Sequence, residues 1–256
     1  MFSTMISKIK NSQDRSKDNL PNISVDCVIF GYDENKLKVL VCKEFVSYNG
    51  EVFLEWKLPG NHVRRQDEDI DETAAHILKE QTGLENIYVK QFMVFSDKSR
   101  LELRKKDFEW VKPRIDDDRV ITVGFYSLIN VSDVDNTKLI EDVSWNDAYE
   151  IKTLMFDHNE IFEEAFKKLR YDLLHEPLVF ELLPEKFTLS QMQRVYEVIF
   201  NTTFDKRNYR KKVNKMQYLI RLDEVQSGVS HKPARLYSYD KKIYEQTRTE
   251  RFDFRV

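Results

Sequence analysis

Residues 60–84 read Gly60-Asn-His-Val-Arg-Arg-Gln-Asp-Glu-Asp-Ile-Asp-Glu-Thr-Ala-Ala-His-Ile-Leu-Lys-Glu-Gln-Thr-Gly-Leu84. Apolar residues recur at helical spacing, at Ile70, Ala74, Ile77 and Leu78. Gly83 follows at the position where a helix C-cap is expected. The stretch therefore predicts a loop after Gly60 and then an amphipathic helix that begins at about Ile70.

Strand-like runs surround this helix. Runs rich in β-branched or apolar residues, several of them bounded by turn residues, predict strands at residues 24–30, 38–42, 55–58, 87–95 and 120–131. A second amphipathic helix is expected over residues 159–174, with Ile161, Phe162, Ala165, Phe166 and Leu169 on one face. Strands and helices mixed in this way indicate an α/β or α+β body.

Composition excludes several classes of protein. The chain has 256 residues, 41% of them hydrophobic and 33% charged, which fits one large or, better, two modest packed domains. Its 6 glycines are too far apart for a P-loop or a dinucleotide-binding turn, both of which need clustered glycines against phosphate. The 2 cysteines, Cys27 and Cys42, have no C-x-x-C partner and support neither a zinc site nor a disulfide.

The chain shows no signal for membrane insertion or export. Residues 1–20 have no apolar core region, and nowhere do eighteen apolar residues run together. We expect a cytoplasmic protein whose residues 1–20 form a mobile tail.

Charge is divided unevenly along the chain. From Lys186 to the end there are 16 Lys and Arg against 8 Asp and Glu, which leaves 25 basic and 36 acidic residues of the totals of 41 and 44 for the rest. An acidic body joined to a basic segment suggests that the basic part binds a polyanion. With the boundary placed near residue 180, the predicted domains are 21–180 and 181–256.

The basic segment has the layout of a winged helix-turn-helix. A helix is expected from Ser190, and a second over residues 205–216 with Tyr209, Val213 and Met216 buried. Two strand-like pieces, residues 218–222 and 235–239, then form a hairpin. The alternative for the basic helix is a plain solvated face. Agreement of charge, buried stripe and hairpin favours DNA binding.

The quoted stretch resembles a Nudix box, G-x5-E-x7-R-E-U-x-E-E-x-G-U, where U is a large aliphatic residue. Aligned on Gly83-Leu84, the first glutamate of the box falls on Glu68, and Ile77 and Gln81 replace acids that share one helix face and bind divalent metal. One carboxylate, Glu80, remains, and its alternative role is that of an ordinary helix acid. The resemblance therefore implies a Nudix-like α/β/α sandwich without hydrolytic activity, metal or other cofactor.

The C-terminal pattern F-T-L-x-x-x-Q-x-x-Y-E-x-I, followed by D-K-R-N-Y-R-K-K, resembles that of bacterial Nudix-related transcriptional regulators, as does Phe156-Asp157-His158. The resemblance covers roughly residues 24–245. It implies a homodimer in which a Nudix-like domain senses a small effector and a winged helix binds double-stranded operator DNA. A pentose or other sugar of carbohydrate metabolism and an ADP-ribose-like nucleotide both suit such a pocket, with a slight preference for the sugar. The alternative function is an active Nudix pyrophosphohydrolase with an accessory domain.

Two sets of candidate site residues follow from these resemblances. The basic and polar residues of the C-terminal segment are candidates for DNA contacts: Ser190, Gln191, Lys206, Arg207, Asn208, Arg210, Lys211, Lys215, His231, Lys232 and Arg235. The residues around the altered box are candidates for effector binding: Trp56, Lys57, Asn61, Arg64, His76, Glu80 and Arg119.

Overall fold

The computed structural model describes residues 19–64, 69–103, 107, 109, 119–135, 138–230 and 232–247. The chain divides into two compact units. The first holds the described part of residues 1–31 together with Lys38–Lys167, and the second holds Tyr32–Leu37 together with the described part of residues 168–256.

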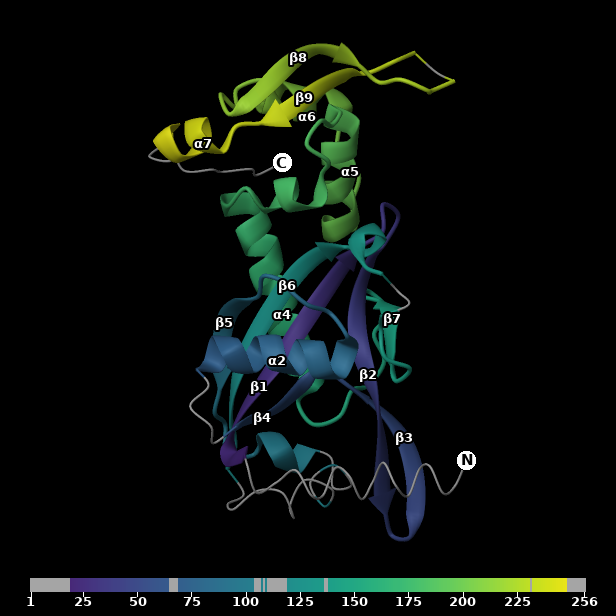
Figure 1. Cartoon of the computed structure of the whole chain (residues 1–256), viewed down its shortest axis with the longest axis vertical. Coiled ribbons are helices and arrows are strands. Elements are labelled where there is room, and N and C mark those ends of the chain that lie inside the picture. Colours follow the sequence, from purple (N-terminus) through teal and green to yellow (C-terminus); the bar gives the residue numbers. More distant parts are fainter. Residues whose placement is uncertain are drawn as a thin grey trace. The chain divides into compact units, whose positions relative to one another are not determined.

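The first unit is built on a seven-stranded sheet with the path β3-β2-β1-β6-β5, in which β4 pairs with β1 and β7 pairs with β2 (Figure 1). The predicted strands are confirmed. The loop predicted after Gly60 is wrong for residues 60–64, because they pair with β1 as the five-residue strand β4, and the five-residue strand β7 is additional. The strands are β1 (Asn19–Tyr32), β2 (Leu37–Tyr48), β3 (Glu51–Lys57), β4 (Gly60–Arg64), β5 (Lys90–Phe95), β6 (Ile121–Asn130) and β7 (Val143–Asp147). Short 3-10 helices follow β5 and β6 as η2 (Arg100–Leu103) and η4 (Val131–Asp133).

Helix α2 (Ile70–Thr82) confirms the helix expected from the quoted stretch. The Asp69 side chain caps its N-terminus by accepting from the Glu72 N–H, and Gly83 ends it with a φ of 79°, a conformation that side chains disfavour. Ala74, Ile77 and Leu78 pack in the core, whereas Ile70 is 37% exposed and does not belong to the buried stripe.

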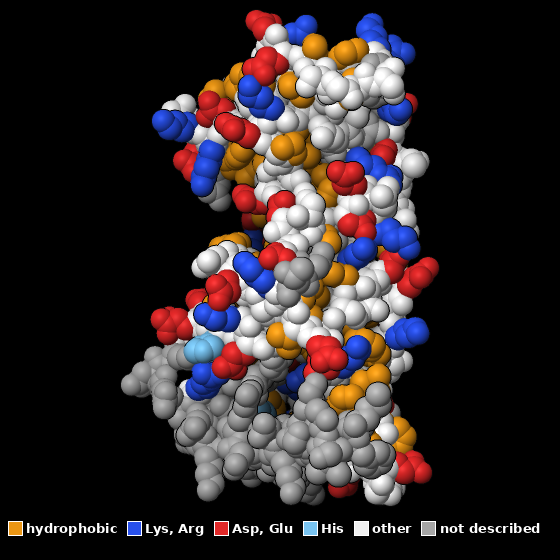
Figure 2. Space-filling view, turned by 45° about the vertical axis from the view of Figure 1, so that its right-hand side comes forward, with side chains coloured by type: hydrophobic (Ala, Val, Ile, Leu, Met, Phe, Trp, Pro, Cys, Tyr) orange, Lys and Arg blue, Asp and Glu red, His pale blue; other side chains and the backbone are white. Residues whose placement is uncertain are grey.

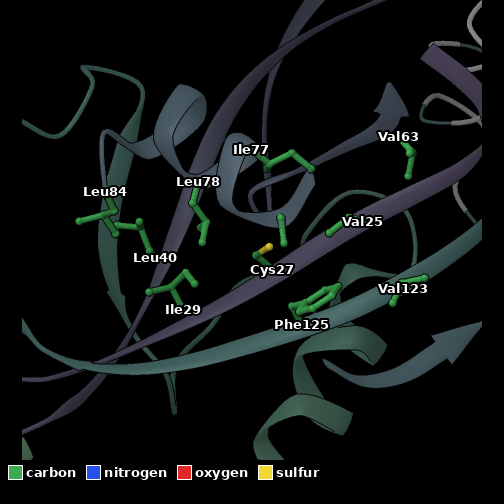
Figure 3. Close-up of a cluster of buried hydrophobic side chains, with 11 residues drawn as sticks. Val25, Cys27, Ile29, Leu40, Val63, Ile77, Leu78, Leu84, Val123 and Phe125 are labelled. Carbon is green, nitrogen blue, oxygen red and sulfur yellow. The ribbon is translucent and has the colours of Figure 1, made fainter. Parts of the chain in front are cut away.

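Alternation along β1 gives the sheet two buried faces. Val25, Cys27 and Ile29 pack with α2 and β6 in one cluster (Figure 3). Phe30 points the other way, where its ring centroid lies 5.9 Å from that of Phe162 and 5.5 Å from that of Phe166. Both partners lie on α4 (His158–His175). The unit is thus the predicted α/β/α sandwich.

The second unit is the predicted winged helix. Its elements are η5 (Leu178–Leu182), α5 (Leu189–Phe200), α6 (Lys206–Val213), β8 (Leu219–Val225), β9 (Arg235–Tyr239) and α7 (Lys241–Thr247). Strands β8 and β9 form an antiparallel hairpin, to which Phe187 adds a bridge at Tyr237. The aromatic side chains of Phe187, Tyr196 and Tyr209 are buried among the helices and the hairpin.

One local prediction for this unit was wrong. The helix expected over residues 205–216 ends at Val213, so Met216 lies in the following turn and is only partly buried. Helix α5 begins at Leu189, one residue before the expected start at Ser190, and its cap Thr188 forms a capping box with Gln191. In the described part of the chain, no helix combines the length and the apolar character that a membrane crossing requires.

Candidate functional site

Gln81 on α2 holds the start of β4. Its Oε1 accepts from the Gly60 N–H at 3.0 Å, and its Nε2 donates to the Gly60 carbonyl at 2.8 Å. A carboxylate could accept the first of these hydrogen bonds but could not donate the second. Gln81 therefore fixes the start of β4 to α2, a role that requires an amide at this position.

Three predicted effector residues form one cluster beside α2. Arg64 on β4 donates to the Glu80 carboxylate at 2.5 Å and lies 3.3 Å from His76 Nε2. His76 and Glu80 are one turn apart, with His76 Nε2 and Glu80 Oε1 separated by 3.8 Å. All three side chains are at least one-third exposed, so the cluster faces solvent and presents both signs of charge.

Trp56 and Lys57 lie at the end of β3. Lys43 Nζ is 5.8 Å from the Trp56 ring centroid, a cation–π contact. Lys57 pairs with Glu44 at 3.2 Å. Burial, the largest single influence, lowers the pKa of Lys57, but the charge and hydrogen bond of Glu44 together with the charges of Cys42 and Asp26 raise it overall. The Trp56 carbonyl accepts from the Met155 N–H at 2.7 Å, which ties this end of β3 to the segment before α4.

The remaining two predicted effector residues, Asn61 and Arg119, make local or backbone contacts. Asn61 follows Gly60, and its side chain accepts from the His62 N–H at 2.9 Å. Arg119 is exposed just before β6, and its carbonyl accepts from the Asn22 side chain at 2.9 Å.

A buried polar network under α4 was not predicted. Arg100 forms two hydrogen bonds with Asp157, of 2.7 and 2.8 Å, and also donates to Thr122 Oγ1. Thr122 in turn shares a 2.6 Å hydrogen bond with Ser24. Asp157 lies in the quoted Phe156-Asp157-His158 motif, but Arg100 gave no sequence signal because its partner is 57 residues away.

Asp26 and His158 lie beside this network. The Leu58 N–H donates to His158 Nδ1 at 3.0 Å, and His158 Nε2 is 3.7 Å from Asp26 Oδ1. Burial raises the pKa of Asp26 to about 6 and lowers the pKa of His158 to about 3. At neutral pH the pair is therefore a carboxylate beside a neutral imidazole. Asp26 breaks an apolar run, which is the sequence signal that could have marked it.

No group of three His, Cys, Asp or Glu side chains suited to a metal ion occurs in the described residues. The box residue Glu68 lies outside them. Ile77 and Gln81, which align with metal-binding positions of the box, carry no carboxylate. Ile77 packs in the core, and Gln81 is bonded to backbone.

Helix α6 buries its apolar side chains and exposes most of its basic ones. Asp205 caps it by accepting from the Asn208 N–H at 2.8 Å, and Tyr209 and Val213 are buried. The basic residues and Asn208 turn outward: the exposed set comprises Lys206, Arg207, Asn208, Arg210, Lys211 and, in the following turn, Lys215. On the face shown in Figure 2, basic and acidic side chains are interspersed, so the arrangement of α6 is more informative than overall charge.

Of the other candidate DNA contacts, some are exposed and others are engaged in hydrogen bonds within the protein. Gln191 accepts from the Thr188 N–H at 2.8 Å, so its amide oxygen is used in the cap, whereas Ser190 is exposed. On the wing, Lys232 is exposed, and Arg235 donates to the Leu222 carbonyl at 3.1 Å. His231 lies outside the described residues.

The fold and these sites define a class of protein: a Nudix-like domain followed by a winged helix with an exposed basic helix. Residues 179–239 match the family described as the NrtR DNA-binding winged helix domain. The chain is similar to the ADPR responsive transcriptional repressor NtrR of Acinetobacter baylyi, with 27% identity over 231 residues, which are 88% of this chain and 84% of the relative.

Two solved structures share the whole architecture. Shewanella oneidensis NrtR, crystallised with a 27mer DNA, is 25% identical with a TM-score of 0.66, covering 90% of this chain and 97% of that one. A MutT/nudix family protein from Enterococcus faecalis has a TM-score of 0.61 at 21% identity, covering 91% of this chain and 98% of that one, which shows the fold alone. These matches relate the chain to the NrtR-type regulators, which combine a Nudix-like domain with a winged helix.

Proposed function

We propose that this protein is a DNA-binding transcriptional repressor whose Nudix-like domain binds an ADP-ribose-type effector that controls operator binding. The observation that carries the proposal is α6. Tyr209 and Val213 anchor the helix while Arg210, Lys211 and their basic neighbours stay exposed. In the described residues, no ion pair involves Lys206, Arg207, Arg210, Lys211 or Lys215, so their charge is available to a polyanion.

Roles within the DNA interface follow from side-chain chemistry. Arg210, Lys211 and Asn208 are proposed to face the major groove, because arginine pairs with guanine and asparagine with adenine. Lys206, Arg207 and Lys232 are proposed to bind phosphates, with Arg235 supporting the wing through its bond to the Leu222 carbonyl. The protein is proposed to act as a homodimer on a two-fold symmetric operator.

The effector is proposed to be ADP-ribose or a close nucleotide analogue. The curated relative is ADPR responsive and aligns over 88% of this chain. The exposed cluster of Arg64, His76 and Glu80 supports this, because a guanidinium suits a diphosphate. A pentose effector, preferred slightly on sequence grounds, gains no support from this relative.

The Nudix-like domain is proposed to sense its ligand without hydrolysing it. Ile77 is buried, Gln81 is bonded to Gly60, and Glu80 pairs with Arg64. None of these three α2 side chains is left as a carboxylate ready to bind Mg2+. The alternative of an active pyrophosphohydrolase would require metal-dependent turnover of nucleoside diphosphate derivatives.

Two measurements test the proposal together. Selection of bound duplexes from a random library with the full-length protein should yield a two-fold symmetric sequence. ADP-ribose should raise the melting temperature in a concentration-dependent way, because a ligand that binds only the native state stabilises it, whereas arabinose should not. Failure to enrich any sequence, or stabilisation by arabinose alone, would contradict the proposal.

A further inference from the structure

In the part of the chain that the structure describes, Asp26 is a buried carboxylate without a hydrogen-bond donor. It lies in the middle of β1 and is only 6% exposed, yet none of the described side chains or backbone N–H groups donates to it. Buried carboxylates are normally paired or hydrogen-bonded, since leaving them without a partner costs free energy. The buried charge of Asp26 therefore lowers stability, and no hydrogen bond from the described residues compensates for it. Such uncompensated groups are found at functional sites.

The nearby cations are already engaged. Arg100 is bonded to Asp157 through two nitrogens, and Lys57 pairs with Glu44. His158 is neutral because burial lowers its pKa to about 3. Its Nδ1 accepts from the Leu58 N–H, so the ring proton must be on Nε2, the atom that faces Asp26 Oδ1 at 3.7 Å.

This geometry leaves one acceptor and one donor side by side but too far apart to bond each other. Direct N–H···O hydrogen bonds are about 2.7–3.2 Å long. A hydroxyl oxygen to one side of the two groups, about 2.8 Å from each, could donate its proton to Asp26 and accept from His158 Nε2–H. The pair thus matches a hydroxyl group, which has both functions on one atom.

The backbone beside the pair leaves room for the carboxylate itself. Asp26 pairs with Gly60 across β1 and β4, and a Cβ at position 60 would overlap Asp26 Oδ1. Gln81 holds the same glycine from α2 through two hydrogen bonds. The carboxylate is not completely sealed, because the Asp26 side chain is 8% exposed.

We propose that Asp26 and His158 together bind a hydroxyl group of the effector, as the polar end of the ligand site of the Nudix-like domain. The inference rests on the proposed function for the identity of the ligand, and it adds a recognition element for a ribose hydroxyl. Neither residue was predicted from the sequence, and neither belongs to the altered metal-binding positions of the box.

Isothermal titration calorimetry of the full-length protein with ADP-ribose tests the inference. Asp26→Asn should weaken ADP-ribose binding about 10- to 100-fold, the usual loss for a hydrogen bond to a charged group. The same variant should melt no lower than the parent, which separates impaired recognition from impaired folding. His158→Asn is a second variant, since its Oδ1 can still accept from the Leu58 N–H while the Nε2 donor is removed. It should weaken binding about tenfold.

Ligand analogues identify the contact. An ADP-ribose analogue that lacks the recognised ribose hydroxyl should bind the parent as weakly as Asp26→Asn binds ADP-ribose, and the variant should lose nothing further with that analogue. Glu141→Gln changes charge equally at an exposed site and should bind ADP-ribose like the parent.

The outcomes separate the two proposals. If the parent binds ADP-ribose and both variants bind it equally well, the hydroxyl site is wrong while the effector assignment stands. The hydroxyl site is also wrong if Asp26→Asn loses as much affinity as the parent for every deoxy analogue. If the parent binds no ADP-ribose, the effector assignment fails and the inference fails with it.

Discussion

The two units use charged side chains in opposite ways. In the Nudix-like unit, Arg100 is buried against Asp157, and Arg64 is bonded to Glu80. In the winged helix, Arg210 and Lys211 are exposed on α6, and no ion pair to them occurs in the described residues. Buried charges such as Arg100 and Asp157 in the first unit therefore specify structure, whereas those of α6 remain available to a partner. Substitutions should change stability in the first case and DNA affinity in the second.

The largest effect on stability is expected at Asp157. Asp157→Ala leaves the Arg100 guanidinium buried and uncompensated, which should cost about 3–5 kcal/mol of unfolding free energy. Urea unfolding of the variant and of the exposed control Glu141→Gln would measure it. A decrease below about 1 kcal/mol would mean that Arg100 finds another partner.

Removing the charge of Asp26 should raise the unfolding free energy, which is opposite to the effect at Asp157. Burial raises its pKa from 3.8 to about 6, so the folded state binds a proton more tightly than the unfolded state. Its contribution to stability is therefore fully present below about pH 4 and is lost as pH rises through about 6. Asp26→Asn should raise unfolding free energy at pH 7.5 by up to about 3 kcal/mol and change it little at pH 4. A destabilised variant at pH 7.5 would show that the carboxylate has a structural partner.

A substitution at Gln81 tests whether its hydrogen bonds to Gly60 stabilise the fold. Gln81→Glu removes the donor to the Gly60 carbonyl and places an anion against it, which should cost about 1–3 kcal/mol. Denaturant unfolding measures this cost, and an assay of ADP-ribose with Mg2+ should detect no hydrolysis by parent or variant. Turnover of the parent at about 1 per second or faster would identify an enzyme instead.

A substitution at Arg210 tests whether the exposed charges of α6 act in DNA binding and not in stability. Arg210→Ala should weaken binding to the selected operator by about 1–3 kcal/mol and relax preference at one position of each half-site, while stability changes by less than about 0.5 kcal/mol. Gel-shift titrations and thermal melts measure the two effects separately.

Lys232→Ala is the matched control for Arg210. It should weaken binding to all sequences alike and reduce the salt dependence by about one unit of slope for each phosphate that the lysine no longer neutralises. If Arg210→Ala and Lys211→Ala both bind operator like the parent, α6 does not read DNA.

The smallest effect on stability is expected at Glu80. This residue is on the solvent side of α2, so Glu80→Gln should change unfolding free energy by less than about 0.5 kcal/mol and leave DNA affinity unchanged. Its effect should appear only in the concentration of ADP-ribose needed for half-maximal response. An unaltered response would remove Glu80 from the effector site.

Elements with a long periodic pattern could be predicted from sequence. Helix α2 was confirmed because its apolar stripe and Gly83 act locally, and α6 because Tyr209 and Val213 are one turn apart. Helix α6 proved shorter than predicted because Met216, although in phase with the stripe, lies in the turn after the helix. Strands β4 and β7 are too short to show a period.

Long-range polar contacts could not be predicted in the same way. Gln81 looked like a missing metal ligand, and only the fold shows that it bonds Gly60, 21 residues earlier. His158 is 100 residues from Leu58, whose N–H fixes its tautomer. Such partners are chosen by tertiary packing, so sequence spacing carries no information about them.

The most direct test of the account is fluorescence anisotropy of the selected duplex titrated with the full-length protein, with and without saturating ADP-ribose. If the Nudix-like domain controls the winged helix, ADP-ribose should change DNA affinity at least about tenfold, a coupling free energy within the usual range. Arabinose should leave the affinity unchanged. Equal DNA affinity with and without ADP-ribose would contradict the central claim that this domain senses that ligand to control operator binding.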